Sequence, residues 1–333
     1  MKYDVAVIGN DEAAFEMLSL SALGHRRTLA ILPEMRHSAF LMSLAMRRLV
    51  TELLVERSPA RCRLLHAAAN PRLLRSMLTR AVAEETHEQV RRLQSLGVHV
   101  IVGEAKFLSP RELEVMSGTG NCRQQVSARN VVIATGTMQT SLRATPGFGT
   151  SQRPESLFHG AAFPRELEVV GHGDFAAGLA AIVSLLGVRT HLRTRDDATS
   201  AVQELARIAG VRFLDSRRTN DTVEGDRKVI DCRRDVGFTR HLNLGQIGIQ
   251  ADENEQLWCS AGLETWCPGI YGIGHVVGFH TGGNARPLRQ ARLIFEAIVD
   301  SIPRPHFLGR ARRLQPVTSR TAPTRRRRGG LAG

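Results

Sequence analysis

The sequence predicts an α/β fold built on parallel strands, because a pattern of strand, glycine turn, helix and strand occurs twice in its 333 residues. The first copy has a strand over residues 2–9, a helix over 12–23 and a second strand over 27–32. The second copy begins at Leu167 as LEVVGHGDFAAGLAAIVSLLGVRTHLRT. Another apolar strand that ends at a glycine, VVIATG at 131–136, lies between the copies. Such an internal duplication indicates two Rossmann-like units in one chain.

The remaining elements follow from apolar periodicity and from residues that begin or end helices. Asn70 caps a helix that has Pro71 in its first turn, and its apolar stripe is Leu74, Leu78 and Val82. The other predicted elements are a helix at 38–56, a strand at 98–102, a meander with a turn at Ser109-Pro110, a helix at 201–209, a strand at 211–214, a turn-rich loop at 216–227, short strands at 257–278 and a helix at 287–299.

Composition excludes several classes of protein. Apolar residues make up 42% and charged residues 23%, which is typical of a soluble globular chain. No window holds 18 uncharged apolar residues, and a strand begins at once after Met1, so we expect no membrane span, no signal peptide and a cytoplasmic location.

The five cysteines predict neither a disulfide framework nor a metal site. Their number is odd and they form no C-x-x-C pair. A late group of cysteines and histidines has no standard spacing of zinc ligands, and its members are Cys259, Cys267, His275 and His280.

The formal net charge of +13 comes mostly from the C-terminal end. Nine arginines and no acidic residue lie in 301–333, so the rest of the chain carries only +4. This segment has too few apolar residues to pack, and we predict a disordered arginine-rich tail over 303–333. Contact with nucleic acid is expected only through this tail, and a solvated extension is the favoured alternative.

The second glycine turn, GHGDFA, matches a dinucleotide-binding G-x-G-x-x-A motif. Gly171 permits the tight turn, Gly173 lets a pyrophosphate approach the backbone, and Ala176 lets the helix pack closely on the strand. Arg193 and Arg195 stand where an acidic residue would bind a ribose 2′-hydroxyl, and they would suit the 2′-phosphate of NADP. Arginines at an exposed strand end are an equally good interpretation, so NADP and NAD both stay open.

The first glycine turn departs from this motif. Gly9 and Ala14 keep their places, but Asp11 replaces the glycine that allows close approach of a phosphate. The negative charge of Asp11 would also oppose a pyrophosphate, because two like charges about 4 Å apart repel by roughly 1 kcal/mol even in water. The acid expected at the end of the next strand is missing, although Glu34 lies nearby. Asp11 has a second interpretation as the N-cap of the helix that follows.

Five segments together resemble a known family: the two βαβ units, VVIATG, GQIGIQADENEQLW, and CPGIYGIGHVVG at 267–278. The chain resembles the FAD/NAD(P)-dependent pyridine nucleotide–disulfide oxidoreductases, and within them soluble pyridine nucleotide transhydrogenases and dihydrolipoamide dehydrogenases. The resemblance implies an FAD-binding domain at 1–149 and 243–302, with an NAD(P)-binding domain at 150–242 inserted between its parts. It places Thr135, Gly136, Gly274 and His275 at the flavin.

The chain also departs from that family. The segment 33–50 has no cysteine where the family carries a redox pair, and the family's Gly-Asp reads Gly274-His275. We also expect no C-terminal interface domain of the kind that the family has. We therefore predict no catalytic side chain. The resemblance implies a transhydrogenase-type flavoprotein with an eroded FAD site, whose small-molecule partners are dinucleotides. The alternative is a non-catalytic homologue that keeps the fold and NAD(P) binding.

Overall fold

The computed structural model describes residues 2–33, 39–55, 70–117, 122–138, 151–160, 162–195, 200–215, 227–233, 236–280 and 286–301. Several predictions lie outside these residues: Glu34, the boundary at 149/150, most of the loop at 216–227 and the tail at 303–333.

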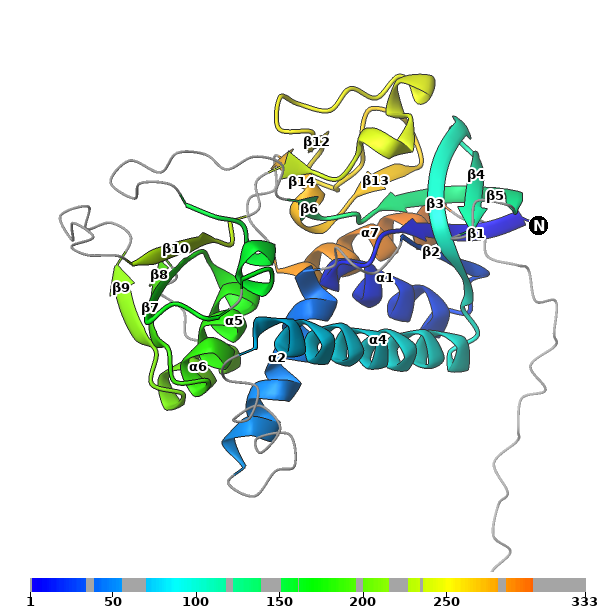
Figure 1. Ribbon diagram of the computed structural model, residues 1–333. Helices are drawn as coiled ribbons and strands as arrows, with labels where there is room; N and C mark the ends of the chain where they lie inside the picture. Colours follow the sequence, from blue (N-terminus) through cyan, green and yellow to red (C-terminus); the bar gives the residue numbers. More distant parts are fainter. Residues whose placement is uncertain are drawn as a thin grey trace, which may run out of the picture.

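The first unit is a parallel sheet with an antiparallel meander attached (Figure 1). Its parallel strands are β1 (Lys2–Ile8), β2 (Thr28–Leu32), the first part of β3 (His99–Ser109), the end of β5 (Arg123–Ile133) and β13 (Ile270–Gly272). The outer parts of β3 and β5 leave this sheet and pair on either side of β4 (Glu112–Ser117). Since β13 pairs beside β5, residues from both ends of the chain form one sheet.

Helices α1 (Glu12–Leu23), α4 (Pro71–Ser95) and α7 (Pro287–Ser301) pack on the face of this sheet opposite the meander. The predicted start of α4 is confirmed, because the Asn70 side chain accepts a hydrogen bond from Arg72 N and Pro71 occupies the first turn. The stripe Leu74, Leu78 and Val82 is buried as expected.

The second unit is a four-stranded parallel sheet in the order β10-β7-β8-β9. Its strands are β7 (Glu166–Val170), β8 (Arg189–Thr194), β9 (Arg212–Asp215) and β10 (Lys228–Asp231), and its helices are α5 (Gly173–Leu185) and α6 (Ala201–Ile208). All of these elements fall in the chain between β5 and β13. The predicted α/β fold with a second Rossmann-like unit inserted in the first is confirmed.

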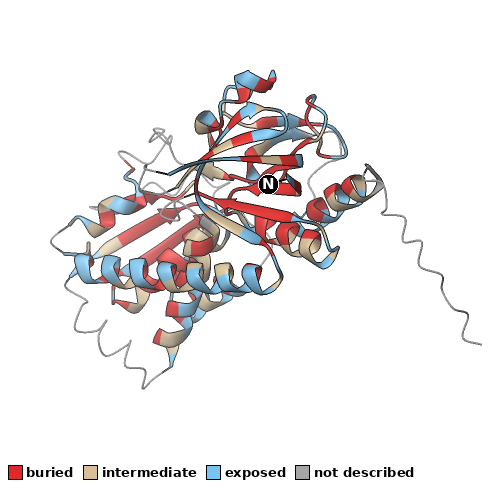
Figure 2. Ribbon diagram, turned by 90° about the vertical axis from the view of Figure 1, so that its right-hand side faces the viewer, coloured by how far each residue is buried: buried red, intermediate tan, exposed pale blue. Residues whose placement is uncertain are grey.

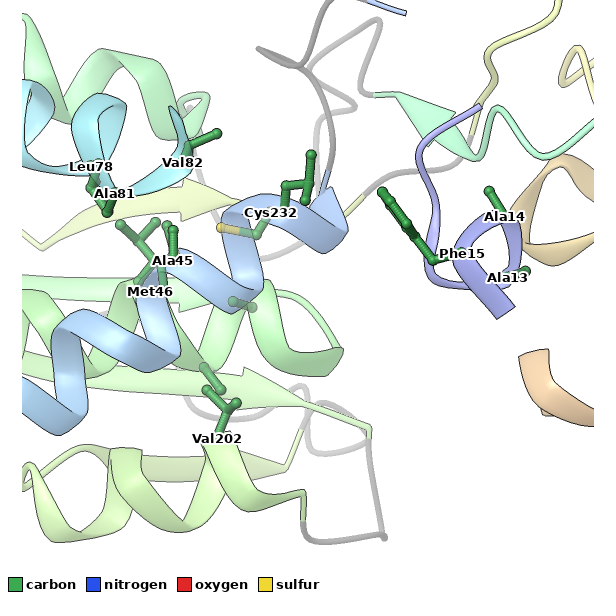
Figure 3. Close-up of a cluster of buried hydrophobic side chains, with 14 of the residues drawn as sticks. Ala13, Ala14, Phe15, Ala45, Met46, Leu78, Ala81, Val82, Val202 and Cys232 are labelled. Atoms are coloured by element: carbon green, nitrogen blue, oxygen red, sulfur yellow. The ribbon is translucent and has the colours of Figure 1, made fainter. Parts of the chain in front are cut away.

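Helix α2 (Ala39–Leu54) joins the two units, because it packs on both α4 and α5. Figure 3 shows Ala45 and Met46 of α2 close to Leu78 and Ala81 of α4. On its other side, a Cβ built on Gly178 of α5 would lie only 2.8 Å from the Cβ of Met46. The helices therefore cross in close contact, and one hydrophobic core runs through both units.

A second core lies between the first sheet and its meander and is closed by short elements. These elements are β12 (Leu257–Cys259), β14 (Val277–His280) and the 3-10 helices η3 (Arg240–Leu242), η4 (Leu244–Ile247) and η5 (Gly274–Val276). The paired short strands β6 (Thr137–Met138) and β11 (Val236–Gly237) lie outside this core, and the 3-10 helix η2 (Pro154–Phe158) packs in the first core. Figure 2 shows the buried residues concentrated in the strands, while the helices alternate buried and exposed positions. Within the described ranges, no helix combines the length and the apolar character that a bilayer crossing requires.

Candidate functional site

A cavity of about 590 Å³ lies between the two glycine turns. Its walls come from the first turn and η5, from α2, and from the second turn with the residues after β10. The lining residues are Asp11, Glu12, Phe40, Ser43, Leu44, Arg47, Thr137, His172, Gly173, Asp174, Phe175, Cys232, Arg233 and His275. The volume is within the range of small-molecule sites.

The backbone of the first turn keeps the shape of a nucleotide-binding turn. Gly9 has φ +135°, and a Cβ there would lie 1.9 Å from the carbonyl oxygen of Ala134. Only glycine fits this close approach between the ends of β1 and β5. Ala14 is fully buried on α1, Thr135 is buried, and Gly136 turns the chain with φ +67°. These four predicted residues therefore lie together at one end of the first sheet.

The carboxylate of Asp11 fills the space in front of this turn. Its Oδ1 accepts a 2.7 Å hydrogen bond from Glu12 N, which confirms the predicted cap of α1. Its Oδ2 lies 3.3 Å from both the backbone nitrogen and Nδ1 of His275. A Cβ on Gly274 would lie 2.6 Å from this oxygen, and one on Gly136 would lie 3.5 Å away. Because Gly136 and Gly274 have no side chains, the Asp11 carboxylate has space between them.

Charges at this turn are coupled. Burial alone would raise the pKa of Asp11, but the hydrogen bonds and charge of His275 outweigh burial and lower it. The hydrogen bond to Asp11 raises the pKa of His275 despite partial desolvation. Burial raises the pKa of Glu12, and the charges of Asp11, Glu16 and Asp174 raise it further. Carboxylates from both turns therefore face each other across the cavity.

The second turn differs from the first at the position that a phosphate would approach. Gly171 packs closely, since a Cβ there would lie 3.0 Å from the Cβ atoms of Ala176 and Cys232. Gly173 has φ +72°, and a Cβ there would meet no atom within 4 Å. His172 is the N-cap residue of α5 and makes no side-chain capping hydrogen bond. The space in front of α5 therefore opens into the cavity.

The two arginines predicted to bind a 2′-phosphate lie in different surroundings. Arg193 is only 2% exposed, and its Nε lies 2.5 Å from Oε1 of the fully buried Glu168. Arg227 holds the other oxygen of Glu168 at 2.9 Å. Arg193 is thus committed to a carboxylate of its own sheet, which argues against a role in coenzyme binding. Arg195 is exposed just after β8 and stays a candidate.

Sequence reasoning missed the contribution of α2 to the cavity. Phe40 and Leu44 supply its apolar wall, and Ser43 and Arg47 supply polar groups. Each pair is spaced i, i+4, which places both members on one helix face. That spacing could have identified the face, but nothing in it shows that the face lines a cavity.

The cysteines have separate environments. Cys232, Cys259 and Cys267 are buried, Cys122 is exposed, and Cys62 lies outside the described residues. Burial raises the pKa of Cys259 to about 11, so its thiol is protonated at neutral pH. In the part of the chain that the structure covers, no three His, Cys, Asp or Glu side chains are grouped as metal ligands would be.

The fold and the cavity together define an α/β protein of the Rossmann type, with two glycine turns facing one space. The chain belongs to the pyridine nucleotide-disulphide oxidoreductase family, whose model matches residues 3–297.

Several curated relatives of the chain are soluble pyridine nucleotide transhydrogenases. The chain is 28% identical to a soluble pyridine nucleotide transhydrogenase of Vibrio cholerae over 225 aligned positions, covering 60% of this chain and 48% of that protein. It is 26% identical to the Pseudomonas putida transhydrogenase over 343 aligned positions, covering 90% of this chain and 71% of that one. The chain thus spans about half the length of the Vibrio relatives it matches.

Solved structures agree on the fold. The HOCl-induced flavoprotein disulfide reductase RclA from Escherichia coli gives a TM-score of 0.58 at 16% identity, covering 91% of this chain and 72% of that chain. LpdA from Mycobacterium tuberculosis gives 0.57 at 21% identity, covering 89% and 72%. At such identities the likeness establishes the architecture alone.

Proposed function

We propose that this chain binds a pyridine nucleotide at its second turn, with the pyrophosphate against the N-terminus of α5 and the nicotinamide end in the cavity. The observation that carries the proposal is the open space beside Gly173, where the backbone takes φ +72° and no atom stands within 4 Å of the Cβ position. A helix N-terminus attracts phosphate through its unpaired amides and its dipole. Arg47 and His172 add cationic or hydrogen-bonding groups to the same cavity.

The family also binds FAD, but the first turn does not fit the pyrophosphate of that cofactor. The carboxylate of Asp11 already accepts from the amides of Glu12 and His275, which are the donors that a phosphate would use. We therefore propose that FAD is held weakly or not at all, and we derive no reaction step through it. Dinucleotides are the proposed partners, and a cytoplasmic location stays a prediction.

Transhydrogenase-type activity is the second candidate. It is favoured by the transhydrogenases among the relatives and by the cavity that both turns face. This activity requires a flavin, so the flavin content of the purified protein tests it. Flavin released by acid from the purified protein, compared with the protein concentration, separates the two candidates: one flavin per chain supports the transhydrogenase, and a flavin-free chain removes it.

Nucleotide binding is tested by calorimetric titration of the full chain with NADPH and with NADH. Gly173→Ala places a methyl group where the pyrophosphate would approach, and we expect it to weaken binding at least tenfold, or about 1.4 kcal/mol. Gly187→Ala is the matched control, because Gly187 has φ +89°, equally open space and a place at the other end of α5. Both variants should lose about 1 kcal/mol of folding stability, because each places alanine in a left-handed backbone conformation.

Only the first variant should lose affinity for the nucleotide. A wild-type chain that binds neither NADPH nor NADH contradicts the proposal, and so does equal loss of affinity in both variants.

A further inference from the structure

The two residues that separately depart from the flavin-binding pattern contact each other. Asp11 replaces a glycine and His275 replaces an aspartate, 264 positions apart in the chain, and their side chains lie 3.3 Å apart. The Asp11 side chain is only 13% exposed, whereas that of His275 is 73% exposed. The pair therefore consists of a largely buried carboxylate covered by an imidazole from a distant part of the chain.

A helix cap alone does not account for this arrangement. Capping explains the hydrogen bond from Glu12 N to Oδ1. It does not explain why Oδ2 turns toward the backbone nitrogen of His275, at the start of η5, and toward the imidazole of the same residue. The carboxylate also fits between Gly136 and Gly274, both of which have positive φ and leave space for it. Donors from two separate chain segments thus converge on one anion.

We infer that the Asp11 carboxylate is a built-in substitute for a bound pyrophosphate, and that the Asp11–His275 pair lets the first turn fold without a flavin. This inference concerns the first turn and is independent of nucleotide binding at the second. Replacing Asp11 by glycine removes the internal anion while the converging amides and His275 remain. The first turn of the Asp11→Gly variant should therefore accept an external anion that the wild-type turn excludes.

Calorimetric titration with inorganic pyrophosphate measures this directly as stoichiometry. We expect Asp11→Gly to bind one more pyrophosphate per chain than the wild type, whatever number the wild type binds at its second turn. Glu12→Gln is the matched control, because it removes one negative charge from the same turn but leaves Asp11 in place; it should bind the same number as the wild type. A wild-type chain that binds neither NADPH nor NADH contradicts the proposed function and leaves this inference unaffected.

Two results of that titration overturn the inference. The first is equal stoichiometry in Asp11→Gly and the wild type. The second is an equal gain in Glu12→Gln, which would mean that net charge alone controls anion binding.

Thermal unfolding tests the pairing without relying on anion binding. His275→Asp would place a second carboxylate against Asp11, so it should lower Tm measurably more than His275→Asn, which removes the imidazole but adds no charge. Adding Asp11→Gly to His275→Asp should restore at least half of that loss. Equal losses in the aspartate and asparagine variants, or further loss in the double variant, contradict the pairing. One flavin bound per wild-type chain would overturn the inference as well.

Discussion

Arg193 offers a test that separates a structural arginine from a coenzyme-binding one. Its guanidinium contacts Glu168 at 2.5 Å and the carbonyl oxygen of Asp215 at 3.4 Å, inside the second sheet. Replacement by methionine keeps much of the apolar volume but removes the charge. Glu168, which is fully buried, then keeps Arg227 as a cationic partner.

The expected cost follows from the burial of the pair. Breaking a buried ion pair by removing one partner costs about 3–5 kcal/mol, because the remaining charge is left without compensation. Arg227 still neutralises part of the Glu168 charge, so we take the lower end, about 3 kcal/mol. At about 2 °C per kcal/mol for a chain of this size, Arg193→Met should lower Tm by roughly 6 °C.

The assay is thermal unfolding followed by circular dichroism, combined with NADPH and NADH titrations. Arg195→Met is the matched control two residues away, since Arg195 is exposed and forms no salt bridge with any residue in the described part of the chain. It should leave Tm within about 1 °C, as exposed charges contribute little. An unchanged Tm in Arg193→Met, together with a selective loss of NADPH affinity, would refute the structural role assigned to Arg193.

Two further predictions concern the first turn. The pair of Asp11 and His275 should stabilise the fold by about 0.5–1 kcal/mol, since His275 is mostly exposed. Because the pKa of His275 is raised, this contribution is complete below about pH 6.5 and is lost as pH rises through the raised pKa. Because the pKa of Asp11 is lowered, the contribution is complete above about pH 3.8 and is lost as pH falls through the lowered pKa. The difference in Tm between wild type and His275→Gln should thus be larger at pH 5.5 than at pH 9, and a difference independent of pH contradicts the pairing. Gly9→Ala should destabilise by roughly 3 kcal/mol or more, because its Cβ would lie 1.9 Å from Ala134 O at φ +135°. Gly97→Ala, at φ +81° in open space, should cost only about 1 kcal/mol in the same chemical denaturation experiment, and equal costs would show that the contact is relieved without strain.

The fold could be predicted from the sequence because its signals are local. Helix α4 begins where Asn70 and Pro71 predict, and the second turn lies between β7 and α5 as its glycines indicate. The strand predicted at 98–102 was too short, since β3 continues to Ser109. Its outer part leaves the parallel sheet and pairs with β4, so one continuous strand serves two partners. A sequence pattern read segment by segment divides such a strand into two elements.

The site was less predictable because its decisive contacts join distant segments. Residues of α2 line the cavity only because Met46 packs closely on Gly178 of α5, and that crossing has no local sequence signal. Considered alone, Asp11 and His275 each replace a residue that would contact the flavin. Two independent replacements of this kind indicate an eroded FAD site. In the structure they form one contact in which the carboxylate of Asp11 meets the imidazole and the backbone nitrogen of His275. Random loss of a binding site has no reason to bring two complementary groups into contact, whereas a turn that folds without a phosphate gains from an anion placed at its amides. The complementarity of the two residues therefore favours an adapted turn over an eroded one, and the stoichiometry of pyrophosphate binding in Asp11→Gly decides between these two explanations.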